Sequence, residues 1–314
     1  MYRDKDTKSI LVTSYLDPDL DGTAGIIAYA EFLNKTGSQA LPGIIGTPHE
    51  EARYVLDRFG FEYPDSVENS DDFENVILVD CSDLDSLGGK ISPEKVIEII
   101  DHRKINQTDK FCNAKVQIEL VGAVVTLVAE RFIQSNLTIS RESAILLYSA
   151  IISNTLNFKG SVTTERDKEV YRWLSTFAKL PPDYWKDIFI AKSDLSGEKL
   201  KDRIEGDLAW FDFGGKRIGV AQIEMIGGKD LIEKRRQEIL ELLIKVKQEV
   251  KFDYIFLSIV DLESFSNFFV TNDKDTKTLV EKVLNVKFLD DWTERAGALM
   301  RKQIFPLLKA ELER

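Results

Sequence analysis

The first half of the chain alternates between short hydrophobic runs and longer segments with hydrophobic residues at helical spacing. The predicted strands are residues 10–14, 39–45, 76–80, 96–102 and 116–120. The predicted helices are residues 24–33, 49–59 and 122–132. Strands that alternate with helices indicate an α/β fold, in which a parallel sheet is doubly wound by its connections.

The second half begins with two helical segments, residues 141–152 and 164–177, and changes character at the Leu-Pro-Pro-Asp sequence of 180–183. Two consecutive prolines end a helix and stiffen the chain, so a domain boundary is expected there. Beyond it we expect a short connecting helix at 184–191, a hairpin at 208–226, a long helix at 231–250, paired strands at 254–260 and 267–271, and a final helix. The predicted organisation is a domain of residues 1–180, a linker of 181–192 and a smaller α/β domain of 193–314.

Composition narrows the classes of function. The 314 residues carry a net charge of −11, which argues against binding of a nucleic-acid duplex because that needs a basic face. No hydrophobic run approaches the ~20 residues of a membrane span, and the N-terminus lacks a signal-peptide core. Two cysteines make no disulfide framework, so we expect a cytoplasmic protein with no membrane association.

Acidic residues follow three of the predicted strands. Asp17, Asp19 and Asp21 lie on the turn after the first strand, Asp80 ends the third, and an Asp-His pair ending in His102 closes the fourth. The carboxyl ends of parallel strands meet at one edge of the sheet, where ligands bind. Crowded carboxylates with one imidazole favour divalent metal ions, manganese before magnesium, with Asp80 bridging two of them. The alternative is that these acids cap helices or bind water.

These residues resemble the motifs of a known superfamily. Asp-x-Asp-Gly at 19–22, the strand-end Asp80 and the Asp-His pair are similar to the DHH phosphoesterases. Residues 119–130 and 149–159 resemble segments of manganese-dependent, family II inorganic pyrophosphatases. Three further segments are similar to the DHHA2 domain, which pyrophosphatases share with exopolyphosphatases and Prune-type proteins. They are residues 191–195, 213–222 and 301–306.

The resemblance implies a set of metal ligands and also shows departures from it. Asp19, Asp21, Asp80 and His102 match family ligands, and two ions of Mn²⁺, or of Mg²⁺ or Co²⁺, are implied. Where the family has a metal-binding His the chain has Tyr15, and Asn154 stands at the position of a ligand Asp. Further candidate ligands are Asp17 and Asn154.

The second His of the family's Asp-His-His is Arg103 here, as in Prune-type proteins. The resemblance further implies that Arg103, Lys192, Arg301 and Lys302 bind phosphate, and that Asp80, His102 and Arg103 are catalytic. The first hypothesis is therefore a metal-dependent phosphoanhydride hydrolase, which acts on short polyphosphate or pyrophosphate at the interface of two domains. The Prune-like departures favour polyphosphate. The second hypothesis is a non-catalytic phosphate or nucleotide binder, and a homodimer is left open.

Overall fold

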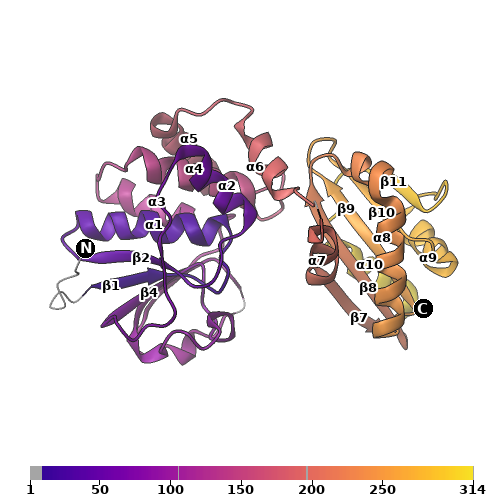
Figure 1. The fold of residues 1–314 in the computed structure, drawn as a ribbon, viewed down its shortest axis with the longest axis horizontal. Helices are drawn as coiled ribbons and strands as arrows, with labels where there is room; N and C mark the ends of the chain where they lie inside the picture. Colours follow the sequence, from indigo (N-terminus) through magenta and orange to yellow (C-terminus); the bar gives the residue numbers. More distant parts are fainter. Residues whose placement is uncertain (1–8, 105, 196, 314) are drawn as a thin grey trace. The chain divides into compact units, whose positions relative to one another are not determined.

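The computed structural model describes residues 9–104, 106–195 and 197–313 and divides the chain into two compact units, residues 1–191 and 192–314. In Figure 1 the first unit runs from indigo to pink and the second from salmon through orange to yellow. Each unit has its own sheet, helices and hydrophobic core.

The first unit is built on a six-stranded sheet whose strands all pair in parallel, in the order β3-β2-β1-β4-β5-β6. The strands are β1 (Ile10–Thr13), β2 (Ala40–Ile44), β3 (Asp65–Ser66), β4 (Asn75–Val79), β5 (Val96–Asp101) and β6 (Lys115–Ile118). The α-helices are α1 (Leu20–Lys35), α2 (Glu50–Phe59), α3 (Val124–Gln134), α4 (Arg141–Asn154), α5 (Glu165–Ala178) and α6 (Tyr184–Lys192). The strand order reverses direction between β1 and β4, which is the point where ligands bind in open α/β sheets.

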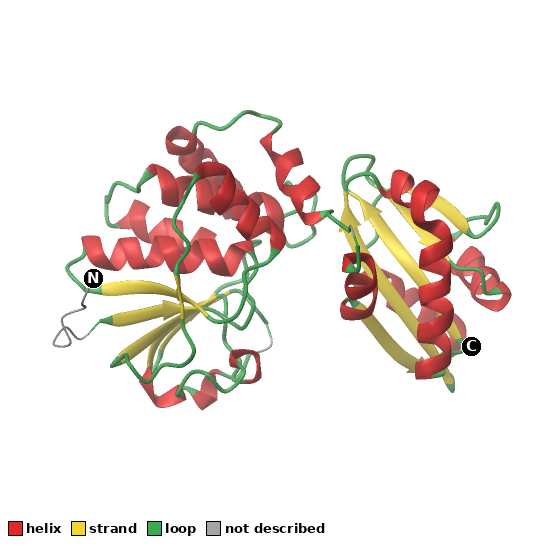
Figure 2. Ribbon diagram, viewed as in Figure 1, coloured by secondary structure: helices red, strands yellow, loops and turns green. Residues whose placement is uncertain are grey.

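Helices cover one face of this sheet in layers (Figure 2). Helices α1 and α3 pack on the strands, α4 packs on both of them, and α5 packs on α4. The opposite hydrophobic cluster includes Leu87, Ile91 and Phe111, which come from the loops carrying the short 3₁₀ helices η1 (Asp85–Leu87), η2 (Pro93–Lys95) and η3 (Thr108–Lys110). Both faces of the parallel sheet are therefore covered, as its hydrophobic strands require.

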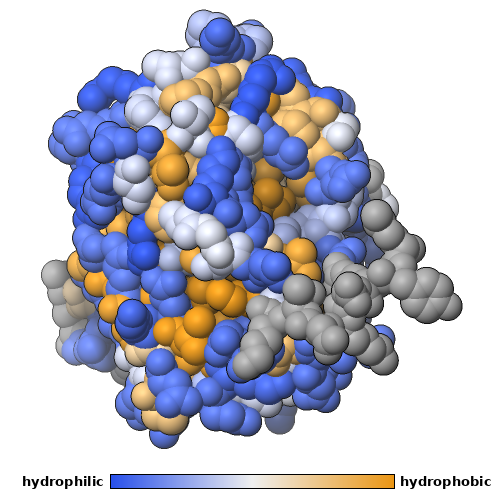
Figure 3. Space-filling model, turned by 90° about the vertical axis from the view of Figure 1, so that its left-hand side faces the viewer, coloured by the Kyte–Doolittle hydropathy of each residue, from blue (hydrophilic) through white to orange (hydrophobic). Residues whose placement is uncertain are grey.

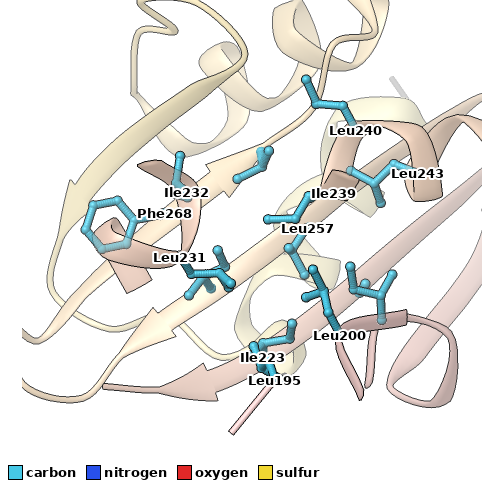
Figure 4. Packing of buried hydrophobic residues seen from close by; sticks show 14 of the residues in the cluster. Leu195, Leu200, Ile223, Leu231, Ile232, Ile239, Leu240, Leu243, Leu257 and Phe268 are labelled. Carbon is cyan, nitrogen blue, oxygen red and sulfur yellow. The ribbon is translucent and has the colours of Figure 1, made fainter. Parts of the chain in front are cut away.

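The second unit has a five-stranded sheet of order β11-β10-β9-β8-β7, in which only β8 and β9 pair in parallel. Its elements are α7 (Lys199–Gly206), β7 (Leu208–Phe213), β8 (Lys216–Met225), α8 (Gly228–Val250), β9 (Tyr254–Asp261), β10 (Ser266–Val270), α9 (Lys274–Leu284), β11 (Trp292–Ala296) and α10 (Arg301–Leu312). Figure 4 shows Leu231, Ile239 and Leu243 of α8 packed with Leu257 and Phe268 of the strands. A second cluster joins the sheet to α9 and α10.

The predicted fold class is confirmed: a parallel α/β sheet is followed by a smaller α/β unit. The hairpin is also confirmed, with Gly214 and Gly215 at φ of 56° and 74° in its turn. Among the described strands and α-helices, four were not predicted: β3, α7, α9 and β11. The segment 301–306 forms the first turns of α10 and includes Pro306. No helix in the described residues is long and apolar enough to cross a membrane, and the face in Figure 3 is mainly hydrophilic.

Candidate metal centre

Three side chains from three neighbouring parallel strands meet at the carboxyl edge of the first unit's sheet. Asp21 lies in the first turn of α1, Asp80 directly follows β4, and His102 directly follows β5. One ligand atom from each lies within 4.8 Å of the others. The His102 Nε2 atom is 3.4 Å from Asp80 Oδ1 and 3.9 Å from Asp21 Oδ2. Among the described His, Cys, Asp and Glu residues, this is the group arranged to hold a metal ion.

The surroundings orient each of these ligands. The Asp21 carboxylate accepts hydrogen bonds from the backbone N–H groups of Val124 and Val125, at 2.7 and 3.1 Å, at the start of α3. A helix N-terminus favours a negative charge, so these two bonds hold the Asp21 carboxylate in place and partly offset the cost of burying it. His102 Nδ1 is 2.9 Å from the carbonyl oxygen of Val121. Donation from Nδ1–H to that carbonyl leaves the Nε2 lone pair facing the two carboxylates, as a metal ligand requires.

The turn after β1 has little free space, because a Cβ added to Gly22 would lie 2.6 Å from Ser14 Oγ. This close approach brings the first turn of α1 directly over the end of β1, and Asp21 is fully buried there. Asp80 adopts a positive φ of 61° immediately after its strand. For a residue other than glycine this is an uncommon conformation that concentrates at functional sites.

Burial and crowding leave this cluster short of positive charge. Burial, followed by the charge of Asp80, raises the pKa of Asp21 well above its usual range. Burial also raises the pKa of Asp80 to about 6, in spite of the facing imidazole of His102. Burial alone would lower the pKa of His102, but the attraction of Asp80 and Asp21 outweighs it and raises the pKa to about 10. Without a metal, the cluster therefore retains a proton that a cation would displace.

The residues present suit a divalent metal ion. Asp80 Oδ1 is buried and, among the described groups, has no hydrogen-bond donor, because the His102 contact at 3.4 Å lacks hydrogen-bonding geometry. A buried carboxylate oxygen without a donor is costly unless a cation binds to it. Two carboxylates and one imidazole nitrogen match the mixed oxygen and nitrogen ligands of manganese.

The other predicted ligands have separate partners. Asp19 is the N-cap of α1, with Oδ1 accepting the Gly22 N–H at 3.0 Å, although its charge still acts on the cluster by raising the pKa of Asp80. Asp17 Oδ1 accepts the Thr47 N–H at 2.6 Å. Asn154 donates its amide N–H to Asp21 Oδ2 at 2.6 Å, so it holds one of the ligands by a hydrogen bond.

Arg103 lies beside the cluster, with Nη2 at 3.8 Å from Asp80 Oδ1. Its guanidinium stacks on the ring of Tyr15, with Cζ 5.1 Å from the ring centroid. The Tyr15 hydroxyl accepts the backbone N–H of Asp19 at 3.0 Å, which fixes the ring. Burial, with the charges of Asp19 and Asp80, raises the pKa of Tyr15 above its usual range, so the phenol stays neutral.

The three predicted phosphate-binding residues beyond Arg103 belong to the second unit. Lys192 is the last residue of α6, and Arg301 begins α10. The Arg301 guanidinium donates to Asp207 Oδ1 at 2.7 Å, and its backbone N–H donates to Gln222 Oε1 at 2.5 Å. Lys302 is exposed next to it.

Two buried acids support the centre: Asp101, which the sequence marks as the first member of the Asp-His pair, and Asp167, which was not singled out from the sequence. Asp101 accepts the His102 N–H at 2.7 Å and the Ser82 hydroxyl, which ties the His102 backbone to the end of β4. Asp167 accepts N–H groups from Gly122 and Ala123, at 2.9 and 3.4 Å, and so holds the segment leading into α3. Asp167 is 45 residues from Gly122, and its role depends on tertiary packing.

A six-stranded parallel sheet with Asp, Asp and His at its carboxyl edge, followed by a smaller α/β unit, defines a DHH-type phosphoesterase with a second domain. Family models agree: residues 9–151 match the DHH family, N-terminal domain, and residues 186–310 match the DHHA2 domain. The chain belongs to the family of manganese-dependent inorganic pyrophosphatases with these two domains.

Individual relatives match nearly the full length. A manganese-dependent inorganic pyrophosphatase of Methanothrix thermoacetophila is 31% identical over 310 residues, 98% of this chain and 99% of the relative. A protein of Clostridium acetobutylicum, named a probable manganese-dependent inorganic pyrophosphatase, is 30% identical over 97% of this chain and 98% of its own. A crystal structure from Methanococcus jannaschii, provisionally assigned as a family II inorganic pyrophosphatase, is 29% identical with a TM-score of 0.67 and covers 97% of this chain and 100% of that chain.

Proposed function

We propose that this chain is a manganese-dependent phosphoanhydride hydrolase with pyrophosphate as its substrate. The observation that carries the proposal is the meeting of Asp21, Asp80 and His102 within 4.8 Å at the switch point of the sheet. The relatives named above, which are called manganese-dependent inorganic pyrophosphatases, support both the metal and the substrate.

Asp21, Asp80 and His102 are the residues that would hold the metal ion. Bound there, manganese would lower the pKa of a water molecule and offset the charge of a phosphate. Asp21 contributes a carboxylate fixed by the N-terminus of α3, and His102 contributes Nε2, with Nδ1 held by the Val121 carbonyl. These contacts position the ligands before substrate arrives, and phosphoryl transfer depends mainly on positioning and charge stabilisation.

Arg103 is the phosphate-binding group proposed closest to the centre. Its side chain is 34% exposed, so the guanidinium can reach a substrate while remaining next to Asp80. A guanidinium presents a planar pair of N–H donors that matches two oxygens of one phosphate. Lys192, Arg301 and Lys302 are proposed as further phosphate contacts from the second unit.

Two features favour a second candidate function, binding of phosphate or a nucleotide without turnover. Tyr15 cannot replace an imidazole ligand at neutral pH, because a phenol normally has a pKa of about 10. Asn154 carries no charge, and its amide is directed at Asp21. The preference for short polyphosphate, the binding of substrate between the two units, the cytoplasmic location and a homodimer stay predictions.

A phosphate-release assay with pyrophosphate and tripolyphosphate, in manganese, magnesium or cobalt, tests the proposal. We expect release from pyrophosphate with manganese, and loss of that release to background in Asp80→Ala. Asp85→Ala is the matched control, since Asp85 is an exposed residue of η1 on the loop after the same strand, and its carboxylate accepts from Gln107 at 3.3 Å. It should retain most of the activity. Binding of pyrophosphate without phosphate release under every metal would favour the non-catalytic function instead.

A further inference from the structure

The guanidinium of Arg103 is surrounded by carboxylates. Its Nη2 is 3.8 Å from Asp80 Oδ1, its Nη1 is 3.6 Å from Asp83 Oδ2, and its Nε is 3.9 Å from Asp101 Oδ1. Each distance is longer than a hydrogen bond, so charge attraction rather than fixed bonding holds the group. The Asp80 carboxylate therefore has two neighbours that can carry a positive charge, the guanidinium of Arg103 and the imidazole of His102.

Tyr15 fixes the other side of this guanidinium. The ring lies 5.1 Å from Arg103 Cζ, within the range of a cation–π contact, and is itself partly buried against the hydrophobic cluster under the sheet. Because the Tyr15 hydroxyl accepts the Asp19 N–H, the ring cannot turn away without losing that bond. The Tyr15 ring thus holds the Arg103 guanidinium in position, and one permanent positive charge lies next to Asp80.

This charge competes with a metal ion for the same carboxylate. The described residues provide one group of three ligand atoms within 4.8 Å of one another, from Asp21, Asp80 and His102, and this group is a site for one divalent ion. A second ion shared through Asp80 would lie close to the guanidinium, and like charges at such a distance repel strongly in a partly buried site. No imidazole or carboxylate stands at Tyr15 to offset that repulsion.

We propose that Arg103 takes the place of a second metal ion, so that the chain binds one manganese at this centre and not the two that the family resemblance implies. The inference rests on the proposed function, because it presumes that manganese binds at the cluster. Arg103 would then supply the positive charge that offsets Asp80, and its partly exposed guanidinium would contact the phosphate. One divalent ion and one guanidinium form the substrate-binding pair.

The number of bound ions tests this directly. The full chain is stripped of metal and titrated with manganese, and free ion is counted from the electron paramagnetic resonance signal of aqueous Mn²⁺. We expect one tight site per wild-type chain, with the spectrum of an isolated ion. In Arg103→Gln the site should tighten about tenfold or more, because the competing charge is gone. In Tyr15→His with Arg103→His we expect two ions per chain and a spin-coupled spectrum.

Arg131→Gln is the matched control. Arg131 also lies over a tyrosine ring, that of Tyr29, with Cζ 5.4 Å from the centroid, and pairs with Glu98 at 2.9 Å in the same unit. Its loss should leave the manganese count and affinity unchanged. A coupled pair of ions in the wild type would overturn the inference while leaving the proposed function intact. One bound ion without hydrolysis would support the inference and refute the proposed function, and a chain that binds no manganese would refute both.

Discussion

Asp80→Asn should make the metal-free protein more stable and at the same time remove its response to manganese. Asp80 is buried, with 2% of its surface exposed, and the amide has nearly the size of the carboxylate. The backbone at this position has a φ of 61°, and asparagine tolerates that conformation better than most residues. The substitution therefore changes the charge with little change in shape.

The magnitude follows from the raised pKa of Asp80. Burial moves this pKa from 3.8 to about 6, and at 1.36 kcal/mol per unit the ionised carboxylate costs the fold at most about 3 kcal/mol, because Asp80 also raises the pKa of His102 and so recovers part of that cost. Because the folded-state pKa lies above the unfolded one, the cost is fully present above about pH 6 and disappears as the pH falls through about 4. An amide avoids it. For a unit of this size, 1 kcal/mol corresponds to roughly 2–4 °C in melting temperature, so an increase of up to about 10 °C is expected.

Both the stability of the metal-free protein and its response to manganese can be measured by thermal unfolding at about pH 8, monitored by circular dichroism. One melting curve is recorded with a chelator and one with millimolar manganese. The variant should melt above the wild type in chelator, and the order should reverse when manganese stabilises only the wild type. Asp85→Asn, at an exposed carboxylate, should follow the wild type in both conditions. The assigned role of Asp80 would be refuted if Asp80→Asn melted below the wild type in chelator. It would also be refuted if manganese raised the melting temperature of the variant as much as that of the wild type.

Two further predictions concern groups around the centre. The double variant Tyr15→His with Asn154→Asp adds an imidazole and a carboxylate near the centre; the Asn154 amide nitrogen lies 2.6 Å from Asp21 Oδ2. We expect the variant to bind manganese about tenfold more tightly in isothermal titration. An unchanged affinity would mean that neither side chain reaches the metal. Glu31→Gln should cost about 1 kcal/mol at neutral pH in urea unfolding, because Glu31 accepts from the Ser140 N–H at 2.8 Å and its hydroxyl at 2.6 Å. Burial opposes the charge of Glu31, but the bonds to Ser140 outweigh it and lower its pKa. The stabilisation by Glu31 is present above the unfolded pKa of about 4.3 and is lost as the pH falls through the folded-state pKa. Equal stability of the wild type and Glu31→Gln at neutral pH, or a difference between them that grows in acid, would contradict this prediction.

The sequence predicts the centre well where it depends on strand ends. Asp80 and His102 each follow a hydrophobic run directly, and parallel pairing of β4 and β5 is enough to bring them together. The α/β alternation likewise predicts the sheet, because each strand is hydrophobic along its length and each helix is long enough to show its periodicity. Elements that lack such a pattern, such as the two-residue β3, leave no signal.

The turn between β1 and α1 shows the limit of this reasoning. Asp17, Asp19 and Asp21 are equivalent by spacing, but Asp17 bonds to Thr47, Asp19 caps α1, and only Asp21 joins the cluster. Which carboxylate faces the metal depends on the backbone path of the turn. The orientation of Asn154 depends on the packing of α4 against α1, about 130 residues away in the chain, which no local pattern encodes.

The most direct test of the account is to locate manganese in a crystal of the full chain by anomalous scattering at the manganese absorption edge. We expect a peak bound by Asp21, Asp80 and His102, about 2 Å from their ligand atoms, with the Arg103 guanidinium remaining beside Asp80. A peak at another place in the chain, or a fully occupied crystal without density at these three residues, would contradict it.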